Sequence, residues 1–164
     1  MDAIVSVTDD WGIGRDGNLL VRNREDMRRF VRLTMGGTVL MGHSTFLSFP
    51  GGPLKGRRNV VLSRNPGLVI PGAEVFNDVD QALEATSADG HVWLIGGESL
   101  YRQLLPRCSR VYVTRNHVTV PADAWFPNLD QEDAWAASEP EGSGTTSAGV
   151  DYDFVTYTKE GDKG

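Results

Sequence analysis

One acidic residue stands where its carboxylate could hold a flat heterocycle. Asp26 follows Asn23 at the start of a predicted helix, where Asn23 would cap the helix and the helix dipole favours an acid. Phe30 and Leu33 follow at helical spacing, which places the carboxylate beside apolar surface. The predicted buried stripe of this helix comprises Met27, Phe30, Val31 and Thr34. A partly buried carboxylate has a raised pKa and can accept two hydrogen bonds from a 2-amino-4-oxopyrimidine edge. On the residues alone, helix capping is the more common role.

A glycine-rich segment follows the first predicted strand. Residues 12–17 spell G-x-G-x-x-G, the fingerprint of a Rossmann dinucleotide-binding turn. That turn opens directly into a helix, whereas here residues 18–23 intervene. The second predicted strand also ends in Met41 and Gly42, where the fingerprint requires an acidic ribose partner. We therefore interpret residues 12–17 as a glycine-rich loop, flexible enough to act as a lid.

Short apolar runs alternate with helical patterns along the chain. The predicted buried strands are residues 3–7, 38–41, 59–62, 91–95 and 110–114, and the predicted helices are residues 24–33, 79–85 and 99–105. Residues 134–138 and 150–158 are expected to form an antiparallel hairpin with a loop at 139–149, and the polar residues 159–164 to fray. The sequence predicts one α/β domain: a mostly parallel sheet of about eight strands with a C-terminal antiparallel strand, covered by about four helices.

Composition excludes several classes of function. The net charge of -6 argues against a general binder of nucleic acid or acidic membranes, because such proteins need clustered cations. Cys108 is the single cysteine, which rules out an intrachain disulfide or a cysteine-cluster metal site and fits a reducing compartment. No run reaches the roughly 18 apolar residues of a membrane span, and the first residues lack a charged leader. The cytoplasm is the predicted location.

Seven segments stand in the order and spacing of the dihydrofolate reductase family, which the sequence resembles over nearly its whole length. They are residues 11–14, Asp26 with Phe30 and Thr34, and residues 39–45, 53–64, 95–101, 111–114 and 123–127. The resemblance implies a reductase domain at 1–159 followed by a polar tail at 160–164. It also implies an activity, the transfer of hydride from NADPH to the imine carbon of dihydrofolate. The product, tetrahydrofolate, feeds one-carbon and thymidylate metabolism. A monomer without a metal ion is expected.

The resemblance implies the substrate site residue by residue. Asp26 matches the acid that holds the pterin, and Thr114 matches the hydroxyl that supports the ring through water; these are the predicted catalytic residues. Arg57 matches the arginine that pairs with the glutamate tail, a role suited to a guanidinium with two parallel donors. The other predicted substrate-binding residues are Val5, Ser6, Leu19, Met27, Phe30, Phe49 and Leu54, among which Met27, Phe30 and Phe49 match the apolar wall.

The resemblance also implies an NADPH site. Residues 42–45 would turn backbone amides at a helix N-terminus toward the pyrophosphate. Ser63 and Arg64 would meet the ribose 2'-phosphate, and Gly96-Gly97 matches a glycine pair joined by a cis peptide. The predicted cofactor-binding residues are Ile13, Gly14, Gly42, His43, Ser44, Thr45, Leu62, Ser63, Arg64, Ile95, Gly96, Gly97, Glu98, Ser99, Leu100 and Tyr101.

The chain departs from the family pattern at three places. Residues 19–21 are Leu-Leu-Val where the family usually has Leu-Pro-Trp, so the indole N–H that helps hold a water near the pterin is missing. The loop at 14–24 could therefore close differently. His43 and Ser99 replace frequent arginines. Arg64 would then carry the 2'-phosphate nearly alone, with His43 adding charge at low pH.

Other functions stay open on the sequence. A reductase of the same fold that acts on a ribosylated aminopyrimidine, as in riboflavin synthesis, is disfavoured by Asp26, Phe30 and Arg57. A non-catalytic NADPH or folate binding protein is suggested by the altered loop. An interaction domain with a decayed site would need an exposed apolar patch that the sequence does not display. For a reductase, we expect the loop at 11–20 to act as the lid, water to deliver the proton, and diaminopyrimidine or pteridine antifolates to pair with Asp26.

Overall fold

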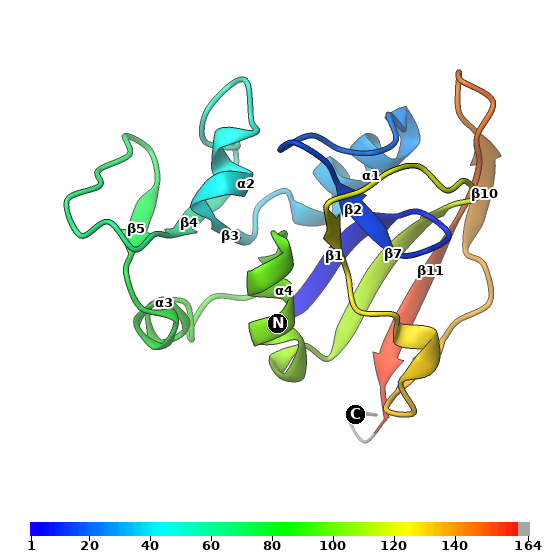
Figure 1. The fold of residues 1–164 in the computed structure, drawn as a ribbon. Helices are drawn as coiled ribbons and strands as arrows, with labels where there is room; N and C mark the ends of the chain where they lie inside the picture. Colours follow the sequence, from blue (N-terminus) through cyan, green and yellow to red (C-terminus); the bar gives the residue numbers. More distant parts are fainter. Residues whose placement is uncertain (161–164) are drawn as a thin grey trace.

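A twisted open sheet forms the centre of the computed structural model, which describes residues 1–160 (Figure 1). Within these residues the sheet has nine strands, in the order β10-β11-β7-β1-β6-β3-β4-β5, with β9 also paired to β11. The strands are β1 (Asp2–Val7), β3 (Thr38–Gly42), β4 (Arg58–Leu62), β5 (Glu74–Phe76), β6 (Val92–Leu94), β7 (Arg110–Asn116), β9 (Trp135–Ala137), β10 (Gly142–Thr145) and β11 (Asp151–Lys159). The neighbouring strands β7, β1, β6, β3, β4 and β5 pair in parallel along the sheet. β11 pairs antiparallel with β7, β9 and β10. The predicted α/β fold is confirmed.

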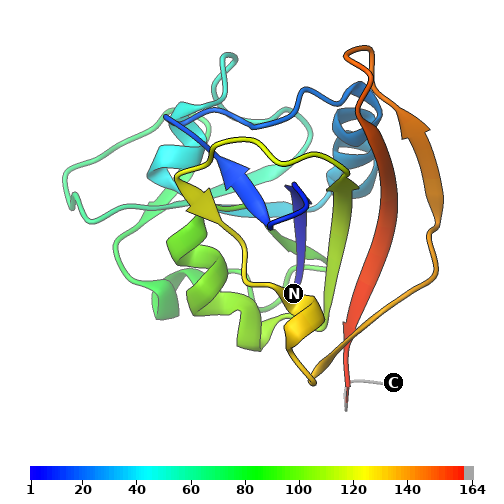
Figure 2. The same cartoon turned by 45° about the vertical axis from the view of Figure 1, so that its right-hand side comes forward.

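Four helices cover the two faces of this sheet (Figure 2). They are α1 (Arg24–Thr34), α2 (His43–Leu47), α3 (Val79–Ala85) and α4 (Glu98–Leu104), and the 3-10 turns are η1 (Leu105–Arg107) and η2 (Leu129–Gln131). Successive strand residues point to opposite faces. In β3, Leu40 therefore joins the core under α3 and α4, while Val39 and Met41 join the core with Phe30 of α1. No helix among residues 1–160 is long and apolar enough to cross a membrane.

The glycine-rich stretches contain strands that the sequence did not predict. β10 lies inside the expected loop at 139–149, and its Gly142 and Gly144 pair with Phe154 and Tyr152 of β11. A Cβ on Gly144 would lie 2.5 Å from the Tyr152 hydroxyl, so the aromatic ring occupies the space of a side chain. Because glycine is a weak strand former, the sequence of this segment alone indicates a loop. The contact with Tyr152 comes only from the tertiary structure.

Two further expectations need correction. The predicted loop at 12–17 begins with the short strand β2 (Gly12–Gly14), which pairs with β8 (Ala124–Trp125) in a separate sheet. Lys159 does not fray, because it belongs to β11 and its N–H donates to the Ser109 carbonyl at 3.1 Å. The Glu160 N–H donates to the Ala134 carbonyl at 2.7 Å. Residues 161–164 of the expected tail lie outside the described part of the chain.

Candidate active site

Asp26 lies in the first turn of α1, directly against β7. The Asn23 side chain caps the helix by accepting from the Asp26 N–H at 3.0 Å, as the sequence predicted. The Thr114 hydroxyl donates to Asp26 Oδ1 at 2.5 Å, so it contacts the acid itself. Burial raises the pKa of the Asp26 carboxyl, while the Thr114 hydrogen bond and the charge of Arg29 act to lower it. The result is a half-buried carboxylate in a fixed orientation.

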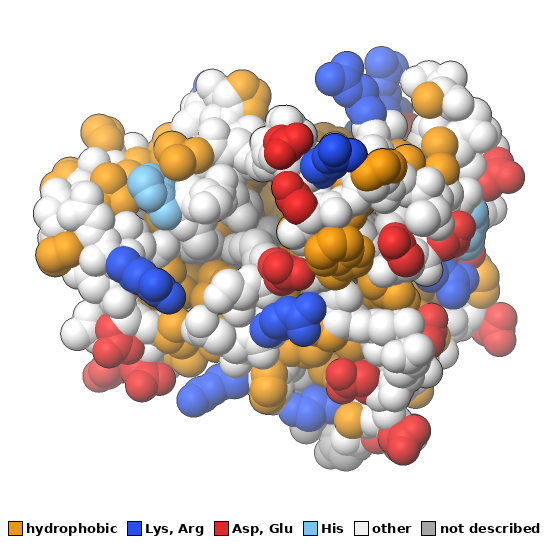
Figure 3. All heavy atoms as spheres, viewed as in Figure 1, with side chains coloured by type: hydrophobic (Ala, Val, Ile, Leu, Met, Phe, Trp, Pro, Cys, Tyr) orange, Lys and Arg blue, Asp and Glu red, His pale blue; other side chains and the backbone are white. Residues whose placement is uncertain are grey.

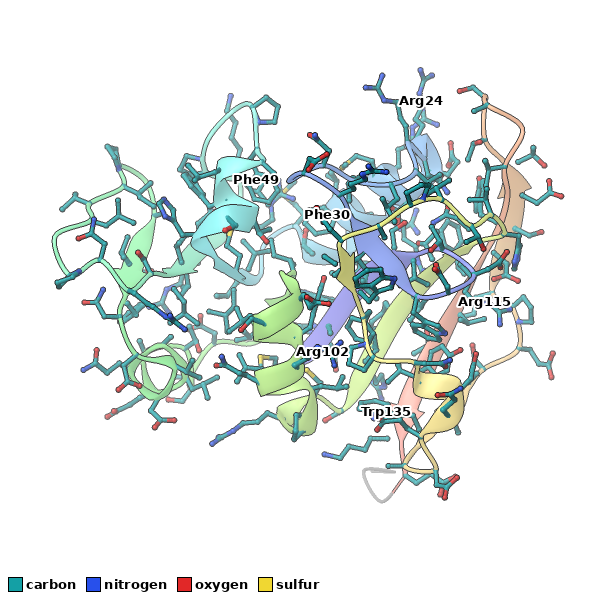
Figure 4. All side chains as sticks on the ribbon, viewed as in Figure 1. Arg24, Phe30, Phe49, Arg102, Arg115 and Trp135 are labelled. Carbon is teal, nitrogen blue, oxygen red and sulfur yellow. The ribbon has the colours of Figure 1, made fainter. Side chains whose placement is uncertain are left out.

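An apolar wall continues from Asp26 along α1. Phe30 and Leu33 are partly buried in one cluster with Phe49 and Leu54 from the segment after α2. The molecular surface is hollowed between the half that carries α2 and the half that carries β2 (Figure 3). In Figure 4, Phe30 and Phe49 lie on facing sides of this hollow. The groove can therefore enclose a flat ring between aromatic side chains.

The predicted buried stripe of α1 is only partly correct. Phe30 is partly buried and Thr34 is buried, but the Met27 and Val31 residues are 49% and 39% exposed. The second buried residue of the helix is Arg29. Its guanidinium lies over the ring of Phe154, which turns this side of α1 toward β11. A pattern of apolar residues cannot reveal that a charged side chain occupies a buried position.

Arg57 stands at the other end of α1 from Asp26. Its Nη1 donates to the Thr34 hydroxyl at 3.1 Å, and its Nε donates to the Lys55 carbonyl at 3.0 Å. The buried Asn59 side chain fixes this loop, accepting from the Leu54 N–H and donating to the Leu54 and Arg57 carbonyls. Eight residues separate Asp26 from Thr34, a rise of about 12 Å along the helix. The groove thus has a carboxylate at one end and a guanidinium at the other.

Two helices begin side by side at the carboxyl edge of the sheet. Gly42 and Gly97 are the N-cap residues of α2 and α4, and neither helix has a side-chain cap, unlike α1 and α3. The Gly42 N–H donates to the Gly96 carbonyl at 2.9 Å. The Gly96-Gly97 peptide is cis, as the resemblance implied. Uncapped amides at a helix start suit an anion such as a phosphate.

The glycine at position 96 is required by its surroundings. Its φ of 126° is disfavoured for other residues. A Cβ there would lie 3.3 Å from the Thr45 hydroxyl oxygen and 3.4 Å from the Tyr101 ring. Bare backbone therefore forms the surface between α2 and α4.

The other predicted cofactor residues fall into two groups. Leu100 and Tyr101 have buried side chains, and the Tyr101 hydroxyl donates to the Ile4 carbonyl at 2.7 Å. Val5, predicted to bind substrate, is buried in the same core. Only the backbone of these residues is left to face a ligand. Those that keep at least partial exposure are Ile13, Gly14, His43, Ser44, Leu62, Ser63, Arg64, Ile95, Glu98 and Ser99, as do the predicted substrate residues Ser6 and Leu19.

Backbone and side-chain hydrogen bonds connect the loop before α1 to the segment that contains β8. Asp123 accepts from the Asp16 N–H at 2.9 Å, and its own N–H donates to the Gly14 carbonyl at 2.9 Å. Glu98 at the start of α4 accepts from the Trp125 N–H at 2.7 Å. The loop, β8 and α4 are thus connected to one another.

Two buried polar residues near Asp26 were not predicted from the sequence. Asn116 accepts from the Asn23 side chain at 3.1 Å and donates to the Ser6 hydroxyl at 2.8 Å, joining α1 to β7 and β1. Arg29 lies on the buried side of α1. No sequence motif marks Asn116, whereas the spacing of Arg29, three residues after Asp26, could have indicated a neighbouring side chain.

Comparison with known proteins agrees with this geometry. The family model described as dihydrofolate reductase matches residues 1–159. The dihydrofolate reductase of Mycobacterium tuberculosis is 37% identical over 150 residues, which are 88% of this chain and 89% of that enzyme. The enzyme of Mycobacterium leprae is 46% identical over 104 residues, 62% of this chain and 63% of that enzyme.

A solved structure is similar over almost the whole chain. Dihydrofolate reductase from Enterococcus faecalis, complexed with NADP(H) and RAB-propyl, superposes with a TM-score of 0.86 at 27% identity. The match covers 97% of this chain and 95% of that structure. The sheet, the four helices and the family model lead to one conclusion: the chain belongs to the dihydrofolate reductase family.

Proposed function

We propose that this chain reduces 7,8-dihydrofolate to tetrahydrofolate with NADPH in the groove between α1 and the segment after α2. The family match over residues 1–159 supports this oxidoreductase reaction. The observation that carries the assignment of the site is the Asp26 carboxylate, half-buried, oriented by Thr114 and the Asn23 cap, and flanked by Phe30. It is the group that this groove offers to the amidine-like edge of a pterin.

Asp26 positions the substrate for reduction. Its two oxygens accept hydrogen bonds from the 2-amino group and the adjacent ring N–H, which fixes the ring between Phe30 and Phe49. NADPH, when bound, supplies the hydride. The apolar wall excludes water around the reacting face, so most of the rate comes from orientation in a dry groove. The proton reaches the ring nitrogen from water. The negative charge of Asp26 makes this nitrogen easier to protonate.

The remaining contacts follow from the ends of the site. Arg57, already oriented by Thr34, pairs with the glutamate tail of the substrate. The bare helix starts at Gly42 and Gly97 accept the pyrophosphate of NADPH. Ser63 and the exposed Arg64 bind the 2'-phosphate. Met27, Leu19 and Leu54 complete the substrate wall.

An assay of NADPH oxidation at 340 nm with dihydrofolate tests the reaction and the role of Asp26 together. We expect turnover by the wild type, and a loss of about 100-fold or more near pH 7 in Asp26→Asn, with NADPH binding retained. An undiminished rate in Asp26→Asn would remove Asp26 from the mechanism. A wild type that binds both ligands without oxidation would be a binding protein, and turnover of the ribosylated aminopyrimidine instead would identify the other reductase.

The same carboxylate is the proposed anchor for antifolates. A protonated 2,4-diaminopyrimidine, or a pteridine with the same edge, pairs with Asp26 through two charge-assisted hydrogen bonds. Equal inhibition of the wild type and Asp26→Ala in a titration would contradict this pairing. We also propose that residues 1–159 form the reductase domain, that 160–164 are a tail, and that the chain acts as a cytoplasmic monomer. The single cysteine, the buried and free Cys108, fits a reducing compartment.

A further inference from the structure

Arg29 is a charged side chain buried behind the active site. Only 8% of the residue is exposed, on the side of α1 that packs against the sheet. Its guanidinium carbon lies 4.4 Å from the centre of the Phe154 ring and 5.8 Å from that of Tyr112. Aromatic faces attract a cation and add little hydration, so the charge is held in a site of low dielectric.

The partners of Arg29 compensate its charge incompletely. Nη2 lies 3.9 Å from a carboxylate oxygen of Glu141, at the limit of an ion pair, and Glu141 also accepts from Thr156. Nη1 is buried and has no hydrogen-bond partner among the described residues. Burial lowers the pKa of Arg29, opposed by the negative charges of Glu141 and Asp26. An arginine remains charged in such a site, so it acts strongly on any nearby anion.

The nearest anion in the active site is Asp26, one turn earlier on α1. Side chains three residues apart on a helix are neighbours, with about 5–6 Å between Cβ atoms. The residues that Asp26 and Arg29 contact are themselves neighbours. Asp26 contacts Thr114 and Arg29 contacts Phe154. Thr114 of β7 pairs with Phe154 of β11. Both ribbon views place α1 beside β10 and β11 (Figures 1 and 2).

We propose that Arg29 is a positioning residue for the reduction: a fixed cation, held by Phe154, Tyr112 and Glu141, that keeps the Asp26 carboxylate ionised for the pterin. The inference rests on the proposed role of Asp26 and adds the group that sets its charge. Arg29 acts from behind the helix, through Asp26. Glu141 has the opposite effect on Asp26, because its negative charge partly neutralises the positive charge of Arg29.

The charged and titratable groups that face this pair include Tyr101 of α4, which lies near Asp26 and whose hydroxyl donates to the Ile4 carbonyl. Arg29 faces Asp26 and Arg32 on α1, Tyr112 on β7 and Glu141 beside β10. Burial raises the pKa of Asp26, and Thr114 and Arg29 lower it. Without Arg29, only the Thr114 hydrogen bond opposes the effect of burial, so the pKa of Asp26 rises. Without the negative charge of Glu141, the charge of Arg29 acts more strongly on Asp26, so the pKa of Asp26 falls.

The test is a pH titration of the aspartate carboxyl signals by ¹³C NMR in the protein without ligands, with the Asp26 signal assigned from Asp26→Asn. In Arg29→Gln we expect the midpoint of Asp26 to move upward by about one pH unit, a tenfold change in its acid dissociation constant. Glu141→Gln should move the midpoint downward, and Arg29→Lys should restore it toward the wild-type value. The acid limb of the pH profile of kcat should move in the same directions.

The opposite signs separate this role from a structural one. An unchanged Asp26 midpoint in Arg29→Gln, or a shift of the same sign in Glu141→Gln, overturns the proposal. If Arg29→Gln does not fold, Arg29→Lys and Glu141→Gln decide the question alone: a wild-type midpoint in Arg29→Lys together with a lowered one in Glu141→Gln supports it, and any other result overturns it. Because the titration uses no substrate, its outcome is independent of whether Asp26→Asn loses dihydrofolate reduction.

Discussion

Asp26 combines two conditions that oppose each other. In the proposed role the carboxylate binds a ring away from bulk water, and the same burial disfavours its charged form. Thr114 supplies one hydrogen bond, which recovers part of the lost hydration. Residues at binding sites commonly carry such a penalty, since their environment is arranged for the ligand.

Replacing this acid should stabilise the folded protein. We expect Asp26→Asn to raise the free energy of unfolding at pH 7 by about 0.5–2 kcal/mol, because the amide has no charge to desolvate and can still accept from Thr114. The sign follows from linkage. The folded protein holds the Asp26 proton at pH values where the unfolded chain has lost it, so wild-type stability falls as pH rises through the window from 3.8 to the raised pKa.

Urea denaturation at several pH values measures this difference. The gap between Asp26→Asn and the wild type should close below pH 3.8, where the acid is protonated in both states. A variant that is less stable than the wild type at pH 7 would show that the carboxylate is well solvated or compensated in the folded state.

Residue type and position alone predicted the cap at Asn23, whereas the role of Asp26 and the cis glycine pair were implied by the family resemblance. The cap at Asn23 and the cis Gly96-Gly97 peptide are confirmed. The binding roles of Asp26 and Arg57 stay predictions. The burial of Arg29 could not be predicted, since a charged residue in a helix is normally exposed and its neighbours Phe154 and Tyr112 come from distant strands.

At the scale of elements, α1 is anchored at its start by two asparagines. Asn23 caps the helix with its carbonyl oxygen and donates to Asn116 with its amide nitrogen, and Asn116 reaches Ser6 and the Val7 carbonyl on β1. The first turn of α1 is thereby fixed to two neighbouring strands. The position of Asp26 depends on this anchor as much as on its own contacts.

Substitutions at Asn23 can separate the cap from the anchor. Asn23→Ala removes both and should lower the free energy of unfolding by about 1–2 kcal/mol, whereas Asn23→Ser keeps an acceptor for the helix and should lose less. Urea denaturation gives the two values. We expect kcat to fall in both variants, since both release α1 from Asn116. Equal stability of Asn23→Ala and the wild type would contradict the anchor.

Longer elements with strong apolar patterns were predictable, whereas the glycine-rich strands and the very short strands β5 and β8 were not. The predicted helix at 24–33 and that at 79–85 correspond closely to α1 and α3. β2 and β10 escaped prediction, because their glycines are explained by close approach of Leu20 and Tyr152 from other parts of the chain. Local sequence cannot contain that information.

At the scale of the whole molecule, the sheet separates two cores. α3 and α4 cover one core, and Phe30 and Leu33 of α1 pack into the other. The ends of β3 and β6 lead to the helix starts of α2 and α4, so the proposed cofactor site lies where parallel strands end. The continuous apolar runs predicted that the sheet is mostly parallel, but they did not predict the order of the strands in it.

The single thiol should report on the integrity of this core. Cys108 is 1% exposed, and burial raises the pKa of its thiol to about 12. We expect almost no reaction with a thiol reagent at pH 7.5, and full labelling in concentrated urea. The labelling rate across a urea series, compared with circular dichroism, checks this. Rapid labelling of a protein with native circular dichroism would mean that this core opens locally.

The placement of Asp26 and Arg57 at opposite ends of α1 also bears on resistance to inhibitors. In the proposed site, a compact drug that binds only to the first turn of α1 is unaffected by changes about two turns away, whereas an analogue with a terminal carboxylate needs both ends. Mutations near Arg57 could therefore defeat the longer class and leave the shorter one effective, so that the two classes would not share cross-resistance.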